Sequence, residues 1–242
     1  MAERSKMIEV PARPAAFQLD PSATAVVVVD MQNDFASPGG MFDRAGIDIT
    51  GVQAIVPNVG AVLDAARGLG VFVVYLKMGF RPDLADAGYP TSPTWLKHVP
   101  LDVGAEVVAP DGEPSRILIR DCWNTEIVAE LTPHAGDVVL YKTRYSGFFG
   151  TELDEILRDR RVDRLIVVGA TTSVCVESTV RDAMFRDYHC VVVSDATAEP
   201  IAADSPRSNH DASLLTLELL FSHLATTSDV VTSLRTAAAL PA

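Results

Sequence analysis

The sequence predicts a single-domain α/β protein with a doubly wound, mostly parallel sheet of about six strands and helices on both faces. Two observations support this class. Short runs of β-branched residues are apolar at every position, as in strands that are buried on both faces. Helical patterns separate these runs, and strand–helix–strand repetition gives parallel strands joined by right-handed crossovers. The expected architecture is therefore a Rossmann-like three-layer sandwich.

Five apolar runs predict the strands. They cover, in chain order, residues 25–29, 71–76, 138–141, 165–168 and 191–193. The residues that follow them are, in the same order, Asp30, Lys77, Lys142, Gly169 and the pair Ser194 and Asp195. Ligands of open parallel sheets bind outside the carboxyl ends of the strands, so these positions are the first candidates for a site. A polar residue also commonly occurs where a buried strand emerges into solvent, so position alone assigns no function.

Four apolar patterns at helical spacing predict the helices. The first runs from Val52 to Leu63 and stops before Gly70, a plausible helix end. Shorter patterns follow in residues 153–157, 176–184 and 214–220. The segment 79–114 is rich in proline and shows little periodicity. A loop of this length in a compact domain is typically a lid or a binding wall.

The composition fits one sizeable globular domain. The chain has 242 residues, of which 48% are hydrophobic. We assign residues 1–20 to an N-terminal extension and residues 21–242 to the domain. The net charge is −12, from 20 basic and 32 acidic residues. This balance argues against a nucleic-acid partner and against an anionic membrane surface, but a small anionic substrate stays compatible because a site can be locally basic.

Cysteine usage and the N-terminal residues favour a cytoplasmic protein. The three cysteines, Cys122, Cys175 and Cys190, have no metal-ligand spacing, so neither a disulfide scaffold nor a structural zinc site is expected. Residues 1–20 mix charges with prolines and have no apolar run, unlike a signal or transit peptide. No stretch approaches the ~20 apolar residues that cross a bilayer.

Cys175 is a candidate nucleophile. It follows the strand that ends at Gly169 after a short turn, near the start of a helix. The free N–H groups and the helix dipole at such a terminus lower the pKa of a thiol and can bind an oxyanion. A buried cysteine that packs as a small hydrophobe fits the local context equally well. For Cys190, inside a strand, packing is the better interpretation.

Two charged strand ends fit the remaining roles in a hydrolytic site. Asp30 follows four valines, where partial desolvation raises the pKa of a carboxyl group towards that of a general base. Its alternative role is to cap a turn, which Asp34 could do equally well. Lys142 would offset the charge of a nearby carboxylate and thiolate, and an ordinary surface lysine is its alternative.

Three blocks of the sequence resemble the signature blocks of the isochorismatase-like cysteine hydrolases. They are residues 26–35, 142–151 and 169–179, and the resemblance runs in order over most of the chain. It implies a catalytic triad in which Asp30 is the base, Lys142 gives electrostatic support and Cys175 is the nucleophile. It also implies a cis peptide bond between Ala170 and Thr171, and an oxyanion hole made by the backbone N–H groups of Thr171 and Cys175.

The resemblance also narrows the reaction. No histidine follows the second strand, where nicotinamidases of the family carry metal ligands, so we expect neither a metal nor another cofactor. Isochorismatases that cleave a vinyl ether lack the cysteine, so Cys175 points to hydrolysis of a C–N bond. Residues 144–149 and 174–182 are most similar to ureidoacrylate amidohydrolases. Met78 and Phe80 depart from that pattern, however, and residues 81–86 resemble biuret hydrolases.

The expected substrate is a small linear amide or ureido compound, such as ureidoacrylate, biuret or triuret. We expect a Cys175 thioester and release of ammonia or carbamate. Candidates for the substrate pocket are Asn33, Phe35, Arg81, Trp95, Tyr145 and Phe148. For the aromatic candidates, core or interface packing is an equally good interpretation.

Two other functions stay open. The chain could be another hydrolase of the family, acting on N-carbamoylsarcosine or isochorismate. It could also be a catalytically idle binding subunit, because a fold does not fix a function. We further expect a homo-oligomer, a dimer or a tetramer, since the family commonly assembles and the segment 79–114 could complete a neighbour's site.

Overall fold

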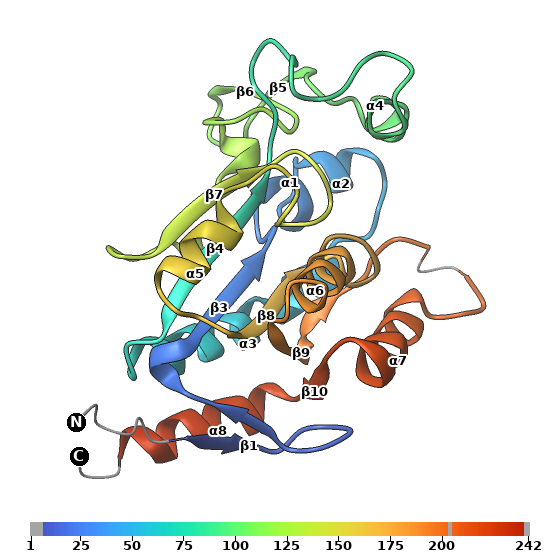
Figure 1. The fold of residues 1–242 in the computed structure, drawn as a ribbon. Helices are drawn as coiled ribbons and strands as arrows, with labels where there is room; N and C mark the ends of the chain where they lie inside the picture. Colours follow the sequence, from blue (N-terminus) through green and yellow to red (C-terminus); the bar gives the residue numbers. More distant parts are fainter. Residues whose placement is uncertain (1–6, 203–204, 240–242) are drawn as a thin grey trace.

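A parallel sheet of six strands forms the centre of the computed structural model, which describes residues 7–202 and 205–239 (Figure 1). The strand order is β10-β9-β8-β3-β4-β7, and every neighbouring pair is parallel. The strands are β3 (Thr24–Val29), β4 (Phe72–Met78), β7 (Val138–Lys142), β8 (Arg164–Ala170), β9 (His189–Ala198) and β10 (His223–Ala225). The predicted α/β class is thus confirmed, with β10 as the strand that no apolar run had indicated.

Helices cover both faces of the sheet and complete three layers (Figure 1). Helices α3 (Thr50–Arg67) and α8 (Thr227–Ala238) pack on the face that carries Val26 and Val28. Helices α5 (Leu153–Asp159), α6 (Glu177–Met184) and α7 (Asn209–Leu220) pack on the face of Val27 and Val29. Both faces of β3 are therefore buried, which explains its continuous apolar run. None of the helices in the described residues is long and apolar enough to span a membrane.

A hairpin precedes the sheet. Of the extension expected over residues 1–20, residues 1–6 lie outside the described residues, as do residues 240–242 at the other end. The antiparallel strands β1 (Ile8–Val10) and β2 (Phe17–Leu19) form the hairpin. Val10 and Leu19 are buried in the same apolar cluster as α3 and α8. The boundary at residue 20 stays a prediction.

A cover lies beyond the carboxyl ends of β4 and β7 (Figure 1). Its elements are α1 (Asn33–Ala36), α2 (Met41–Arg44), α4 (Pro93–His98), β5 (Glu106–Val108) and β6 (Pro114–Arg116). They are held together by an apolar cluster of their own, which includes Phe35, Phe42 and Phe80. The segment 79–114 thus forms part of a packed wall above the end of the sheet.

Candidate active site

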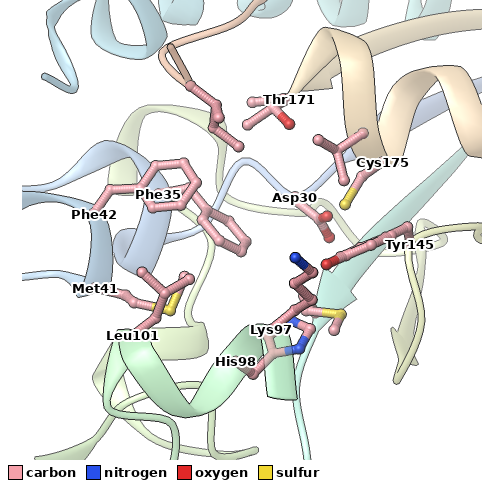
Figure 2. Close-up of a pocket in the computed structure, with 14 residues that line it drawn as sticks. Asp30, Phe35, Met41, Phe42, Lys97, His98, Leu101, Tyr145, Thr171 and Cys175 are labelled. Atoms are coloured by element: carbon pink, nitrogen blue, oxygen red, sulfur yellow. The ribbon is translucent and has the colours of Figure 1, made fainter. Parts of the chain in front are cut away.

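Three strands bring chemically active side chains to one edge of the sheet. Asp30 directly follows β3, Lys142 ends β7, and Cys175 lies shortly after β8. The strand that follows β3 in the chain, β4, pairs on one side of it, whereas β8 pairs on the other. This is the topological switch point at which open α/β sheets bind their ligands. Figure 2 shows Asp30 and Cys175 facing the same cavity.

The backbone lets β3 and β8 approach closely at this edge. Asp30 adopts a left-handed conformation with φ of 50°, which aspartate tolerates better than most residues. Gly169 has φ of 117°. A Cβ atom at Gly169 would lie 2.1 Å from the carbonyl oxygen of Val29. Glycine is therefore required here to keep the turn after β8 beside Asp30.

Cys175 lies in a π-helical turn, Thr172–Val176, that leads directly into α6. The N–H group of Val176 donates to the carbonyl oxygen of Thr171 at 3.1 Å. The peptide bond between Ala170 and Thr171 is cis. Thr171 and Cys175, whose N–H groups the resemblance assigns to the oxyanion hole, both line the cavity.

Lys142 connects the carboxylate and the thiol. Its side chain is completely buried, which excludes the interpretation as a surface lysine. Its Nζ lies 2.7 Å from Oδ2 of Asp30 and donates to Sγ of Cys175 at 3.3 Å. It also donates to the carbonyl oxygen of Arg144 at 3.3 Å. The ammonium group thus balances the charge of the carboxylate and lies beside the sulfur atom.

Burial dominates the protonation equilibria of this cluster. It raises the pKa of the Asp30 carboxyl group and that of the Cys175 thiol, and Lys142 offsets each increase only in part. Burial also works against the charged form of Lys142, but Asp30 and Cys175 raise the pKa of this lysine above its usual value. The thiol pKa thus moves in the opposite direction to the decrease expected at a helix N-terminus, because desolvation outweighs the dipole. The raised pKa favours the neutral thiol, and the Asp30 carboxyl group lies beside it.

The cavity beside the cluster is small, about 100 Å³, and largely apolar. Phe35 and Phe42 of the cover, together with Leu101, form one side, opposite Thr171 and Cys175 (Figure 2). The size favours a small molecule over a polymer. Among the residues that the structure describes, no group of three or more His, Cys, Asp or Glu side chains is arranged to hold a metal ion.

Two of the six sequence-predicted pocket residues, Phe35 and Tyr145, line this cavity. Asn33 does not, because its amide nitrogen donates to the carbonyl oxygen of Trp123 at 2.8 Å and its oxygen accepts from the Ser37 hydroxyl at 2.7 Å. Both ends of the Asn33 amide group are thus used to hold the chain around α1.

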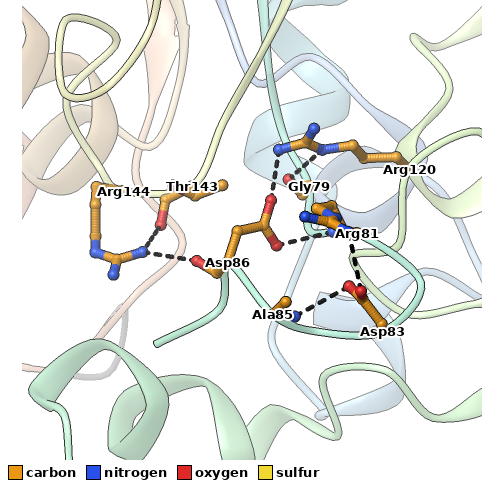
Figure 3. A network of polar contacts seen from close by, with 8 residues as sticks. All are labelled: Gly79, Arg81, Asp83, Ala85, Asp86, Arg120, Thr143 and Arg144. Carbon is orange, nitrogen blue, oxygen red and sulfur yellow. Dashed lines mark hydrogen bonds and ion pairs between the residues drawn. The ribbon is translucent and has the colours of Figure 1, made fainter. Parts of the chain in front are cut away.

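The other three candidates also lie outside the cavity lining. Arg81 directs its guanidinium group to Asp83 at 3.0 Å, with 58% of its side chain exposed (Figure 3). Trp95 of α4 packs against the apolar cluster of the cover. Phe148 is buried under the sheet, where its ring lies 5.6 Å from that of Tyr188. For Trp95 and Phe148 the packing interpretation therefore describes the observed positions.

A polar network fixes the cover next to Lys142. Its centre is Asp86, which forms an ion pair with Arg120 at 2.7 Å and accepts from the N–H group of Arg81 at 2.9 Å (Figure 3). The guanidinium group of Arg144 donates to the carbonyl oxygen of Asp86 at 3.3 Å. Because Lys142 donates to the carbonyl oxygen of Arg144, the network ties the start of the cover to the buried cluster.

Lys97 and His98 of α4 line the cavity, and sequence reasoning missed both. Burial lowers the pKa of His98, so its ring is neutral, and its Nδ1–H donates to the carbonyl oxygen of Thr94 at 2.7 Å. Ser92 followed by Pro93 is a helix-start signal that could have revealed α4. No local signal shows which residues of α4 turn towards the sheet.

The chain is similar to known hydrolases in both sequence and structure. Residues 24–229 match the model of the isochorismatase domain. The chain is 41% identical to a ureidoacrylate amidohydrolase RutB of Caulobacter segnis, over 92% of this chain and 90% of that protein. A cysteine hydrolase structure from Pseudomonas syringae pv. phaseolicola 1448A is 31% identical with a TM-score of 0.75, covering 98% and 100% of the two chains. An N-carbamoylsarcosine amidase structure from Thermoplasma acidophilum is 28% identical with a TM-score of 0.61, covering 84% and 96%.

The chain therefore belongs to the isochorismatase family, as the sequence blocks predicted. Within this family it is an amidohydrolase, a hydrolase that acts on C–N bonds of linear amides.

Proposed function

We propose that the chain hydrolyses a C–N bond of a small linear ureido or carbamoyl compound, with Cys175 as nucleophile, Asp30 as base and Lys142 as electrostatic support. One observation carries the proposal. The Nζ atom of Lys142 lies 2.7 Å from Asp30 Oδ2 and 3.3 Å from Cys175 Sγ, in a buried cluster beside a small apolar cavity. A surface cysteine or lysine would have no such partners.

The reaction begins with transfer of the thiol proton to Asp30. As the proton leaves, the sulfur of Cys175 attacks the substrate carbonyl carbon, and the positive charge of Lys142 stabilises the negative charge that develops on sulfur. Asp30 then gives its proton to the leaving nitrogen, the C–N bond breaks, and a thioester to Cys175 remains. A water molecule, deprotonated by Asp30, attacks the thioester; the C–S bond breaks, the acid is released, and the proton returns from Asp30 to the sulfur of Cys175. Covalent catalysis splits one difficult step into two easier ones.

The turn after β8 supports the same reaction. The carbonyl oxygen becomes negatively charged in each tetrahedral intermediate. The backbone N–H groups of Thr171 and Cys175, on the cavity wall, are the donors proposed to bind it. Loss of one such donor typically lowers kcat about 10²–10³-fold.

Ureidoacrylate is the first substrate to test, because the Caulobacter segnis relative bears that name at 41% identity. Hydrolysis of its ureido group would release ammonia or carbamate. Biuret and triuret are the second choice. Arg81, which begins the segment that resembles biuret hydrolases, forms its ion pair away from the cavity lining. A homo-oligomeric assembly and a cytoplasmic location stay predictions.

The test combines a substrate panel with capture of the intermediate. Ammonia release should be measured with ureidoacrylate, biuret, triuret, N-carbamoylsarcosine and nicotinamide. Mass spectrometry of the enzyme, quenched during turnover, should show an adduct on the Cys175 peptide. We expect Cys175→Ala to lose the adduct and at least about 10³-fold in kcat, since nucleophile and base act as a unit.

Cys190→Ala is the matched control, because Cys190 is also buried but lies in β9 and does not line the cavity. It should keep both the adduct and the activity. Undiminished turnover by the Cys175→Ala variant would exclude the thiol mechanism. Absence of turnover on the whole panel, together with absence of an adduct on the Cys175 peptide, would favour the idle binding subunit.

A further inference from the structure

The side chain of Lys97 brings a cation to the cavity. The proposed chemistry does not use this cation. Its amine points into the cavity, in the direction of Asp30 (Figure 2). Within residues 7–202 and 205–239, Lys97 takes part in none of the ion pairs. Lys142, by contrast, is balanced by Asp30 at 2.7 Å. The neighbouring His98 is neutral, because burial lowers its pKa.

The arginines close to the cavity are directed elsewhere. Arg144 donates to the carbonyl oxygens of Asp86 and Thr143, at 3.3 and 2.6 Å. Arg81 forms its ion pair with Asp83 at the surface (Figure 3). Neither arginine lines the cavity. The charge that a bound molecule meets there, beyond the balanced pair of Asp30 and Lys142, is therefore the positive charge of Lys97.

We propose that Lys97 binds a carboxylate group of the substrate, and that it makes the enzyme select linear amides with a carboxylate over neutral ones. The two groups of the substrate would be recognised by opposite walls. Cys175 and Asp30 belong to the edge of the sheet, and Lys97 belongs to α4 of the cover (Figures 1 and 2). A short molecule with its reactive carbonyl at Cys175 would thus place its far end at Lys97. This inference rests on the proposed function and deepens it.

The charge of Lys97 separates the candidate substrates by their chemistry. Ureidoacrylate carries its ureido group and its carboxylate at opposite ends, whereas biuret and triuret carry no anion. An ammonium–carboxylate hydrogen bond is stronger than a neutral one, and Lys97 offers it from an exposed position at the cavity wall. We expect its loss to lower kcat/KM for a carboxylate substrate about 10- to 100-fold.

The test compares ureidoacrylate with its primary amide, which has the same shape but no charge. The measured quantity is the ratio of kcat/KM for the acid to that for the amide. In Lys97→Met this ratio should fall about 10- to 100-fold, mainly through the KM of the acid, and Lys97→Arg should restore most of it. An unchanged ratio in Lys97→Met would overturn the proposal.

Lys77→Met is the matched control, because the amine of Lys77 lies over the ring of Tyr141, 4.3 Å from its centroid, and does not line the cavity. This variant should leave the ratio unaltered. A decrease as large as that in Lys97→Met would mean that overall charge, and not a carboxylate site, sets the ratio. That result would also overturn the proposal.

A binding measurement separates this inference from the proposed function. The affinity for ureidoacrylate should be measured by calorimetry in Cys175→Ala, which cannot turn the compound over, and in the same background with Lys97→Met. We expect the second change to weaken binding about 10- to 100-fold. Binding that depends on Lys97 without turnover by the wild type would refute only the proposed function. Turnover with neither the affinity nor the kcat/KM ratio dependent on Lys97 would refute only the inference.

Discussion

Asp30 and Asp34 are both buried and lie close together in the sequence, yet their side chains have different neighbours. Asp30, at the end of β3, lies against the ammonium group of Lys142 and the thiol of Cys175 and lines the cavity. Asp34, in α1, accepts hydrogen bonds from the N–H groups of Met41 and Leu118 at 3.0 and 2.8 Å. The cavity lining does not include Asp34.

Burial raises the pKa of both carboxyl groups, so the pKa alone does not separate a base from a structural residue. The pKa of Asp34 is raised to about 7, and its hydrogen bonds offset only part of the cost of burial. What differs is the neighbour. Asp30 faces a thiol whose proton it can take, whereas Asp34 faces donors that cannot give up their protons. The surroundings of Asp30 therefore fit the proton transfer that we propose, whereas those of Asp34 hold α1 to the rest of the cover.

The largest effect should come from replacing the first of these carboxylates. Asp30→Asn keeps the shape of the side chain but removes the acceptor for the Cys175 proton. Because the thiol pKa is raised by burial, the thiol does not ionise without a base. We expect kcat to fall about 10²–10⁴-fold, the range for loss of a general base. Steady-state ammonia release from ureidoacrylate measures the effect.

The matched control for this change is Asp64→Asn, an exposed aspartate on α3. It should leave kcat unaltered. Circular dichroism of both variants shows whether the fold is kept, since Asp30→Asn leaves Lys142 without its counter-ion. A folded Asp30→Asn variant with kcat within tenfold of the wild type would remove Asp30 from the role of base.

The sheet could be predicted from sequence because its strands are buried on both faces. The run from Val26 to Val29 has no polar position that would point to another structure. Strand β10 has only three residues and pairs at the edge, so it carries too little pattern to be seen. Helix α8 begins with a capping box formed by Thr226 and Asp229, and this local signal was available but was not used.

The buried cluster was predictable where residues follow strands, whereas the cavity lining was predicted only in part, at Phe35 and Tyr145. Asp30 and Lys142 are placed by the ends of β3 and β7, and parallel strands bring such ends to one edge. The position of Lys97 depends on how α4 packs within the cover. There the ring of Phe80 lies 5.6 Å from that of His98. Both rings belong to the segment 79–114, but they lie too far apart in it for helical or strand periodicity to reveal the contact. Arg81 is the opposite case. It was predicted to contact the substrate, but its guanidinium group forms an ion pair with Asp83 instead.

The next change, Lys142→Met, removes the ammonium group that lies beside Asp30 and has no equivalent beside Asp34 in the described part of the chain. In Lys142→Met, Asp30 loses the ammonium group that lowers its pKa, so its pKa should rise further. The base is then protonated over a wider range, and the increase of kcat/KM with pH should move to higher pH. We expect activity at pH 7 to fall about 10²-fold or more, as when a charge-stabilising group is removed. The pH profile of kcat/KM for ureidoacrylate measures the shift.

The same variant should lose stability in a pH-dependent manner. A carboxyl group whose pKa is raised in the folded state stabilises the fold at low pH, and this contribution is lost as the pH rises through the raised value. Lys142→Met should therefore be closest to the wild type at pH 5 and least stable at pH 8, by up to about 3–5 kcal/mol. Urea unfolding at these pH values measures it, with Lys77→Met as the control. A constant difference across this range would show that Asp30 does not depend on Lys142 for its charge.

The smallest effect on catalysis, and a distinct one on stability, should come from Asp34→Asn. The carboxyl group of Asp34 accepts from three donors: the N–H groups of Met41 and Leu118, and the side-chain amide of Asn124. An asparagine presents an NH₂ group in place of one oxygen, so at least one buried donor loses its acceptor. Such a loss costs about 1–3 kcal/mol. Met41 lines the cavity, so KM should change more than kcat.

The pH dependence identifies the cause of this destabilisation. The pKa of Asp34 is about 7 in the folded state against an ordinary value of 3.8. Its contribution to stability is therefore complete below about pH 4 and declines as the pH rises towards 7. Asparagine does not titrate, so the stability gap between wild type and Asp34→Asn should be largest at pH 5 and shrink by pH 8. A gap that widens with pH would mean that Asp34 is charged at neutral pH and held by its donors, which would make it an anion site like Asp30 rather than its neutral counterpart.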